Sequence, residues 1–210
     1  MKKLFLLCFI ISSVIFTSCL KIEEYISINN EGIGSYKIKL DLANIAMFHQ
    51  LMNSPTDRLA EEIQYYIDKI RAVKGISNVN FLHSEKYIEI SFDFENTSAF
   101  RRVLLSLTDE HFNIFIPNYI KISNNKIVKK NISPYIDKII QYINMQNSND
   151  FLINDYILGF INFNTYILTP DSIKKISHPL AQQSKQNEVV LKTTLRDLKY
   201  GFNNKIKVKF

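Results

Sequence analysis

The most regular pattern in the chain is an alternation of apolar and polar residues that starts directly after position 19. Ile22, Ile26 and Ile28 fall on one face of an extended strand, and Glu24 falls on the same face. Residues 35–42 alternate in the same way, and the segment NNEGIG joins the two runs. A period of two predicts a hairpin of two strands with one buried face. We expect the glycines at 32 and 34 to supply the positive φ of a tight turn.

Helical periodicity dominates the middle of the chain. Between residues 56 and 74, apolar residues recur every three or four positions, after Ser54 and Pro55 and before Gly75. This pattern predicts an amphipathic helix with its apolar stripe on the core. The stripe consists of Leu59, Ile63, Tyr66, Ile67, Ile70 and Val73. Shorter helices are predicted over residues 44–53, 98–107 and 133–145.

Further strands alternate with these helices. Residues 79–83 and 87–94 predict a second hairpin, whose buried face holds Ile88, Ile90, Phe92 and Phe94. A third pair is predicted over 113–123 and 126–131, with its turn at Asn124 and Asn125. From Tyr156 the chain is predicted to be β again, as strands over 156–168, 188–195 and 205–210, with a loop over 169–187.

The order of these elements favours one continuous α+β domain. Strands, helices, strands, helices and strands follow one another, and no repeat or low-complexity linker divides them. The expected architecture is an antiparallel sheet covered by several helices.

The first 18 residues have the layout of an export signal. Lys2 and Lys3 precede an apolar run that extends from Leu4 to Phe16, which is typical of a secretory signal peptide. The run is shorter than the roughly 20 apolar residues that a transmembrane helix needs, so an uncleaved signal anchor is the weaker alternative. We therefore divide the chain into a signal peptide, 1–18, and a domain, 19–210.

The end of the apolar run resembles the lipobox of bacterial lipoproteins, with Phe16, Thr17 and Ser18 before Cys19. The common pattern has Leu where this chain has Phe16. The resemblance implies that Cys19 receives a diacylglycerol on its sulfur, becomes the new N-terminus and is acylated again. The alternative is an ordinary cleavage site with an incidental cysteine.

Cysteine content favours lipidation. The chain has two cysteines, Cys8 and Cys19, so a chain processed after residue 18 carries one cysteine and no internal disulfide. A free thiol is unusual outside the cytoplasm, and acylation would cap it.

The charge is mildly basic. Loss of Lys2 and Lys3 from the 26 basic side chains leaves 24 against 20 acidic ones. A basic chain suggests nucleic acid as a partner, but an exported domain would lie where there is no chromosome or RNA to bind. Anionic lipid headgroups are the alternative partner. If the early strand and the last strand share a sheet with aligned faces, five lysines form one outward patch: Lys37, Lys39, Lys205, Lys207 and Lys209. The competing interpretation is that the lysines reflect AT-rich codons and keep a sheet face solvated.

No motif for catalysis, cofactor or metal stands out. The G-x-S-x-G elbow of hydrolases is absent, and GIGS at 32–35 joins two strands with no helix after it, so it is interpreted as a turn. The histidines, His49, His83, His111 and His178, are scattered and predict no metal site; His178 is expected to hydrogen-bond locally. The carboxylate pairs Asp57 with Glu61, Glu61 with Glu62, and Asp93 with Glu95 are interpreted as solvated.

With the lipobox, the strand directly after it, the glycine hairpin and the C-terminal segment, most of the chain after residue 18 resembles a group of uncharacterised Bacteroidetes lipoproteins. The shared features are Thr169 with Pro170, the loop 173–179 and the strand 188–197. The resemblance implies a lipidated envelope protein, anchored at the outer membrane, and it supplies no catalytic residue. A resemblance in layout to mycobacterial lipoproteins that handle phosphoinositol mannosides implies a strongly curved sheet able to hold a lipid.

The expected function is therefore that of a non-catalytic, lipid-anchored envelope protein that binds a partner. The partner is an apolar or lipid molecule held between sheet and helices, or another envelope protein paired to an exposed edge such as residues 205–210. The alternative is an envelope hydrolase with an unrecognised site. An internal apolar cavity would favour the lipid, a filled core with an exposed apolar patch would favour the protein partner, and carboxylates or histidines clustered in a cleft would favour the hydrolase.

Overall fold

The fold is known from a computed structural model. It describes residues 20–41, 56–84, 86–107, 118–123, 125–146 and 154–210. The side chains of 56–62, 139 and 142–146 lie outside the description. The predicted helix over 44–53, the first part of the strand over 113–123, and Cys19 are also outside the described residues.

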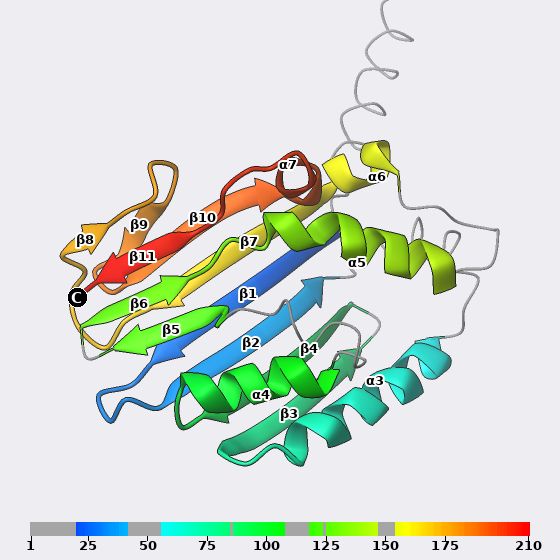
Figure 1. The fold of residues 1–210 in the computed structure, drawn as a ribbon, viewed down its shortest axis with the longest axis horizontal. Coiled ribbons are helices and arrows are strands. Elements are labelled where there is room, and N and C mark those ends of the chain that lie inside the picture. Colours follow the sequence, from blue (N-terminus) through cyan, green and yellow to red (C-terminus); the bar gives the residue numbers. More distant parts are fainter. Residues whose placement is uncertain (1–19, 42–55, 85, 108–117, 124, 147–153) are drawn as a thin grey trace, which may run out of the picture.

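Eleven strands and five helices make up the described chain (Figure 1). The strands are β1 (Leu20–Ile28), β2 (Gly34–Asp41), β3 (Ile76–Ser84), β4 (Tyr87–Phe94), β5 (Ile120–Ser123), β6 (Lys126–Lys129), β7 (Ile161–Leu168), β8 (Lys175–Ile176), β9 (Gln182–Lys185), β10 (Glu188–Thr194) and β11 (Ile206–Lys209). The helices are α3 (Thr56–Arg71), α4 (Thr97–Leu107), α5 (Ser133–Gln146), α6 (Asp155–Gly159) and α7 (Leu195–Lys199).

The strands form two sheets. The large sheet has seven strands in the order β3-β4-β2-β1-β7-β10-β9, and the small sheet has four in the order β5-β6-β11-β8. This confirms the α+β fold class. The expectation of a purely antiparallel sheet is wrong at one point, because β1 and β7 pair in parallel, with Leu20 opposite Ile161. A parallel pair needs a long crossover connection. Here the crossover is the whole chain between β1 and β7, which contains β2 to β6 and α3 to α6.

The β1–β2 hairpin is confirmed, but its two glycines have different roles. Gly32 has a φ of +82°, which is the left-handed conformation that a turn favours in glycine. The φ of Gly34 is not positive, contrary to the expectation. A Cβ on Gly34 would lie 2.1 Å from the ring of Phe94 on β4, so this position needs the absence of a side chain for packing.

The long central helix and the second hairpin are also confirmed. In α3, Ile67 and Ile70 are buried and Ile63 packs against the same core. The assignment of Tyr66 to the core-facing stripe is wrong, because its side chain is 39% exposed. On β4, Phe92 and Phe94 point inward as expected.

The last third departs from the prediction in three places. The start of the strand predicted from Tyr156 is the short helix α6, whose first turn is capped because the Asn154 side chain accepts a hydrogen bond from the Ile157 amide. The loop over 169–187 contains β8 and β9. An unexpected helix, α7, follows β10, and Thr194 with Asp197 forms its capping box.

One face of the large sheet is covered by α3, α4, α5 and the small sheet (Figure 1). Between these layers lies the main core, in which Ile26, Phe94, Phe100, Ile127 and Ile206 meet. A smaller core joins α5, α6 and α7 to the start of β7. Within the described residues, no helix has the length and apolar character to cross a membrane.

The apolar stripe of α3 yields the first prediction. Ile67 is fully buried, so Ile67→Asp would place an unpaired carboxylate in the main core and lower the free energy of unfolding by several kcal/mol. Urea denaturation measures the loss. The matched control is Tyr65→Asp on the exposed side of the same helix, which we expect to stay within about 1 kcal/mol of the parent. Equal stability of the Ile67 variant and the parent would contradict this packing.

Candidate functional site

A carboxylate lies in the centre of the protein. Glu24 points from β1 into the main core and is 1% exposed. Its Oε1 accepts hydrogen bonds from the hydroxyls of Tyr36, at 3.1 Å, and Tyr119, at 2.6 Å. Its Oε2 accepts one from Thr165 Oγ1 at 3.0 Å. Three donors from separate parts of the chain therefore satisfy one buried carboxylate, as burial requires.

The counter-ion of this carboxylate is a buried lysine. Lys129 points inward from β6, is 0% exposed, and places Nζ 3.7 Å from Glu24 Oε2. This distance makes an ion contact and is too long for a hydrogen bond, and no other described group accepts a hydrogen bond from Nζ. The ammonium lies 5.1 Å from the ring centroid of Tyr119 and 5.8 Å from that of Phe163, where the ring faces attract a cation.

The buried environment of Glu24 shifts the pKa values of three neighbouring side chains. Burial lowers the pKa of Lys129, and the negative charge of Glu24 opposes that shift. Burial raises the pKa values of Tyr36 and Tyr119 well above the ordinary range, and the neighbouring charge of Glu24 raises them further. Both hydroxyls therefore stay protonated and remain donors to the carboxylate. We call Glu24, Tyr36, Tyr119, Lys129 and Thr165 the buried polar cluster.

The buried polar cluster ties the two sheets together. Glu24, Tyr36 and Thr165 belong to the large sheet, Lys129 belongs to the small one, and Tyr119 directly precedes β5. Strand alternation had placed Glu24 on the apolar face without a role. A charged residue among the inward positions of a strand is the signal from which a buried polar contact at Glu24 could have been predicted. Its partners were not foreseen, because they come from distant parts of the chain.

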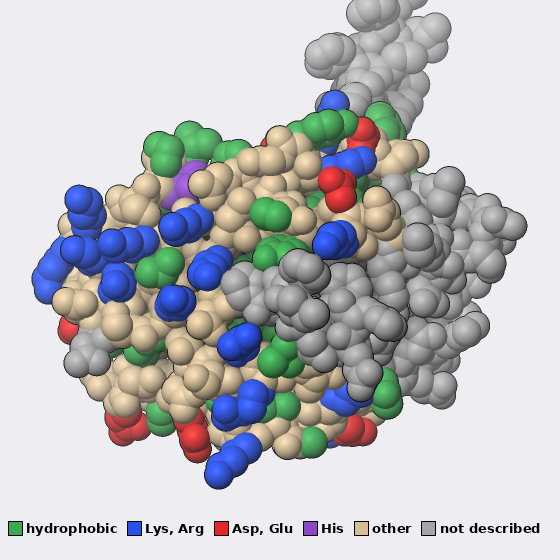
Figure 2. Space-filling view, viewed as in Figure 1, with side chains coloured by type: hydrophobic (Ala, Val, Ile, Leu, Met, Phe, Trp, Pro, Cys, Tyr) green, Lys and Arg blue, Asp and Glu red, His purple; other side chains and the backbone are tan. Residues whose placement is uncertain are grey.

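The outer face of the small sheet is strongly basic. In β11, Ile206 and Val208 point inward and Lys207 and Lys209 outward. In register with them, Val128 and Lys126 of β6 and Lys175 of β8 also point outward. Lys121 of β5 lies opposite Val128. With the flanking Lys130 and Lys205, these lysines form what we call the basic face: Lys121, Lys126, Lys130, Lys175, Lys205, Lys207 and Lys209. Figure 2 shows Lys and Arg gathered over this part of the surface.

The structure separates the five lysines that the sequence grouped. Lys205, Lys207 and Lys209 lie on the basic face, but Lys37 and Lys39 lie on β2 of the large sheet. The premise of one shared sheet is wrong. Lys37 Nζ is 3.7 Å from Glu89 Oε2 and 4.4 Å from the ring centroid of Tyr25. Lys39 Nζ is 4.8 Å from the ring centroid of Tyr87, so both have partners within their own sheet.

A second polar network lies on the outer face of the large sheet. The rings of Tyr25 and Tyr166 stack at 4.5 Å, and their hydroxyls donate to Glu23. Burial opposes ionisation of Glu23, but hydrogen bonds from Lys21, Tyr166 and Tyr25 outweigh it and lower the pKa of the carboxyl. This network holds β1 to β7 and keeps the Glu23 carboxyl ionised and contacted by Lys21, Tyr25 and Tyr166.

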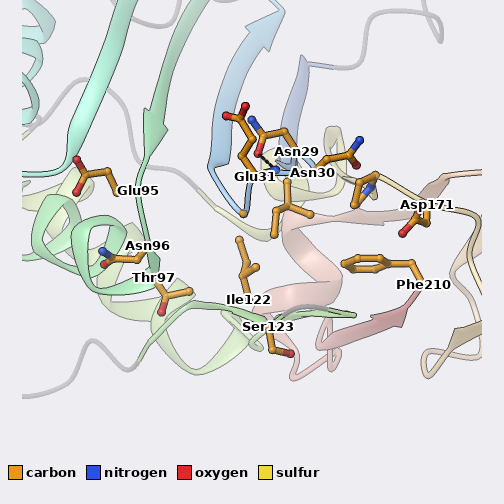
Figure 3. A pocket seen from close by; sticks show the side chains of 13 residues that line it. Asn29, Asn30, Glu31, Glu95, Asn96, Thr97, Ile122, Ser123, Asp171 and Phe210 are labelled. Carbon is orange, nitrogen blue, oxygen red and sulfur yellow. Dashed lines mark hydrogen bonds between the residues drawn. The ribbon is translucent and has the colours of Figure 1, made fainter.

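A pocket of about 740 Å³ lies where the β1–β2 turn, the start of α4, the β5–β6 turn and Phe210 meet (Figure 3). Polar residues line most of it, including Asn29, Asn96 and Asp171. Three carboxylates reach it, those of Glu31, Glu95 and Asp171, but they come from separate elements and do not point toward one another in Figure 3.

The candidate metal and catalytic residues do not converge in the described part of the chain. No three His, Cys, Asp or Glu side chains there are placed to hold a metal ion. His178 makes one local hydrogen bond, in which Nδ1 accepts from the Leu180 amide, and one distant in sequence, with Nε2 2.8 Å from the Asn203 carbonyl oxygen. Asp93 accepts a hydrogen bond from Asn78. His49, His111 and the side chains of Asp57, Glu61 and Glu62 lie outside the described residues.

Comparison with known proteins assigns no family. No family model matches the chain, and no curated protein is significantly similar to it. Among solved structures, the chain is similar to the folded domain of LppM from Mycobacterium tuberculosis, solved by NMR. The TM-score is 0.41 at 7% identity, over 90% of this chain and 88% of that one. A likeness this weak supports no inference.

The buried ion pair yields a prediction about stability. Lys129→Met leaves a buried carboxylate without its cation, and Glu24→Gln leaves a buried ammonium without its anion, so each should cost about 3–5 kcal/mol. The double variant removes both charges, and we expect it to cost at least about 1 kcal/mol less than the sum of the two. Urea denaturation of the three variants and the parent measures this coupling. Simple additivity would show that the two charges do not interact.

The two buried tyrosines predict sensitivity to alkali. In the unfolded chain each hydroxyl loses its proton near the ordinary pKa of 10.0, whereas in the folded protein it stays protonated. Above this pH the unfolded state binds fewer protons, so the stability falls as the pH rises. Replacing both Tyr36 and Tyr119 by Phe should make this fall shallower, although the variant is less stable at neutral pH. Urea denaturation at about pH 9 and about pH 11 measures the slope. The exposed Tyr65→Phe is the control, and an unchanged slope in the double variant would refute the assignment.

Proposed function

We propose that this protein is a lipid-anchored lipoprotein of the bacterial cell envelope, held at the outer membrane, and that its domain binds a partner there without catalysis. The observation that carries the proposal is the position of β1. This strand begins at Leu20, directly after Cys19, and lies between β2 and β7 within the large sheet. Every described element therefore lies on the C-terminal side of the predicted lipid attachment site.

The anchor follows from the chemistry of acyl chains. A single chain binds a bilayer only marginally, but each buried methylene adds about 0.8 kcal/mol, so two or three chains on Cys19 would anchor a protein stably. Because β1 begins one residue after Cys19, no linker would separate the acylated residue from the fold. The domain would then lie against the bilayer surface.

The absence of catalysis is supported by the geometry of the described carboxylates. Glu24 is enclosed by its donors and by Lys129, away from solvent. The carboxylates at the pocket do not face one another (Figure 3), whereas acid and base chemistry on a sugar needs two opposed carboxyl groups. Neither the buried position of Glu24 nor the pocket therefore offers the hydrolase alternative a pair of opposed carboxyl groups.

The nature of the partner is narrowed by two observations. The pocket is lined mostly by polar residues, and an apolar ligand needs a predominantly apolar lining. The edge proposed for a protein partner is not an edge, because β11 lies between β6 and β8. We therefore assign the contact with a partner to the outer surface of the small sheet, in place of the pocket or the β11 edge.

The anchor is tested by metabolic labelling with a palmitate analogue in a bacterial host that processes lipoproteins. We expect the parent to carry the label in the membrane fraction and Cys19→Ser to carry none and to be misplaced. Cys8→Ser is the matched control, because Cys8 lies within the predicted signal peptide, and it should keep the label. Undiminished labelling of the Cys19 variant would remove the proposal.

A further inference from the structure

We propose that the basic face binds the anionic headgroups of the bilayer that holds the anchor, so that the small sheet lies flat on the membrane. The inference rests on the proposed function, since it needs the domain to be at a membrane surface.

The first argument is the charge of the basic face. It presents seven lysines, and β5, β6, β8 and β11 contain no Asp or Glu. Within the described chain none of the seven makes an ion pair, in contrast to Lys21, Lys37, Lys185 and Lys199. Like charges so close together repel one another. This unneutralised field is complementary to an anionic surface.

The second argument is the geometry of the strands. Neighbouring strands lie about 4.8 Å apart, and outward side chains recur about every 6.7 Å along a strand. The inward residues Ile127, Ile206 and Val208 are fully buried, so the lysines that alternate with them are held on the outer side of the sheet. The charges are thus presented together from one side, as contact with a flat surface requires.

The third argument is composition, which distinguishes a membrane from other anionic partners. Protein interfaces are enriched in aromatic residues and Arg and depleted in Lys, but the outward residues here are lysines with Val128 and Ser123. Proteins that bind single-stranded nucleic acids add aromatic side chains that stack on bases, and none points outward from these four strands. Headgroup binding needs only the positive charges.

The test measures binding of the chain from Leu20 to phosphatidylcholine vesicles, with and without phosphatidylglycerol. This chain contains every described element and both cores, and circular dichroism with thermal melting confirms that each variant folds. The basic-face variant carries Lys121→Gln, Lys207→Gln and Lys209→Gln. The matched control carries Lys74→Gln, Lys86→Gln and Lys192→Gln, which removes the same charge from exposed positions outside the basic face.

We expect the parent to bind only the anionic vesicles, and to bind them more weakly as salt rises from low to physiological concentration. The basic-face variant should lose about tenfold or more in affinity, and the control should change much less. Equal losses in both variants would overturn the proposal, because net charge alone would then explain binding. Negligible binding by the parent, or preference for a soluble polyanion such as heparin over anionic vesicles, would also overturn it.

The outcome is independent of the anchor. The chain from Leu20 lacks Cys19, so failure of the vesicle test leaves lipidation standing. Conversely, if labelling showed that Cys19 is not acylated, vesicle binding would still identify a peripheral, headgroup-binding protein.

Discussion

The buried carboxylate of Glu24 is the interaction on which the arrangement of the two sheets depends. A carboxylate with no solvent contact is tolerated only where donors and a cation surround it. Here Tyr36, Tyr119 and Thr165 donate, and Lys129 lies 3.7 Å away. Because each partner comes from a different segment, the carboxylate is satisfied only when the small sheet sits on the large one in this register. Hydrophobic packing alone would tolerate more than one arrangement of the same apolar faces.

The ion pair also determines which way the lysines of the small sheet point. Side chains alternate along a strand, so the inward position of Lys129 on β6 places Lys126 and Lys130 near the outer surface. The register with β11 then puts Lys207 and Lys209 on the same outer face. One lysine is thus neutralised in the core, while its neighbours form an unneutralised surface. A single buried contact links the stability of the domain to the orientation of its basic face relative to β1.

The two faces of the large sheet have different roles. The inner face packs against helices and the small sheet around Phe94 and Phe100, and Gly34 leaves room for the Phe94 ring. The outer face uses charge pairs and stacked rings, as at Glu23 and Tyr25. On this face, Lys37 and Lys39 are already engaged by Glu89 and by tyrosine rings. This explains why two groups of lysines with the same alternation in sequence differ in their availability to a partner.

Local patterns were sufficient to predict much of the fold. The hairpins of β1 with β2 and of β3 with β4, and the helices α3, α4 and α5, follow from periods of 2 and 3.6 and from nearby turn and capping residues, which act within a few positions. The helix α6 was missed because Tyr156 to Leu158 are as apolar as the strand that follows, and only the cap at Asn154 distinguishes them. The short strands β8 and β9 were missed because none of their residues is buried, so that only pairing with β11 and β10 defines them.

By itself, the sequence determined the alternation of the strands, the helices α3, α4 and α5, and the placement of Cys19 directly before the first strand. Only the tertiary structure decided that β1 and β7 are parallel, that Lys37 and Lys39 lie in a different sheet from Lys207, and that Lys129 is buried beside Glu24. The physical reason is sequence separation. Periodicity tells which face of a strand is apolar, but it carries no information about which distant strand pairs with it. The partner is chosen by packing and by the need to neutralise a buried charge.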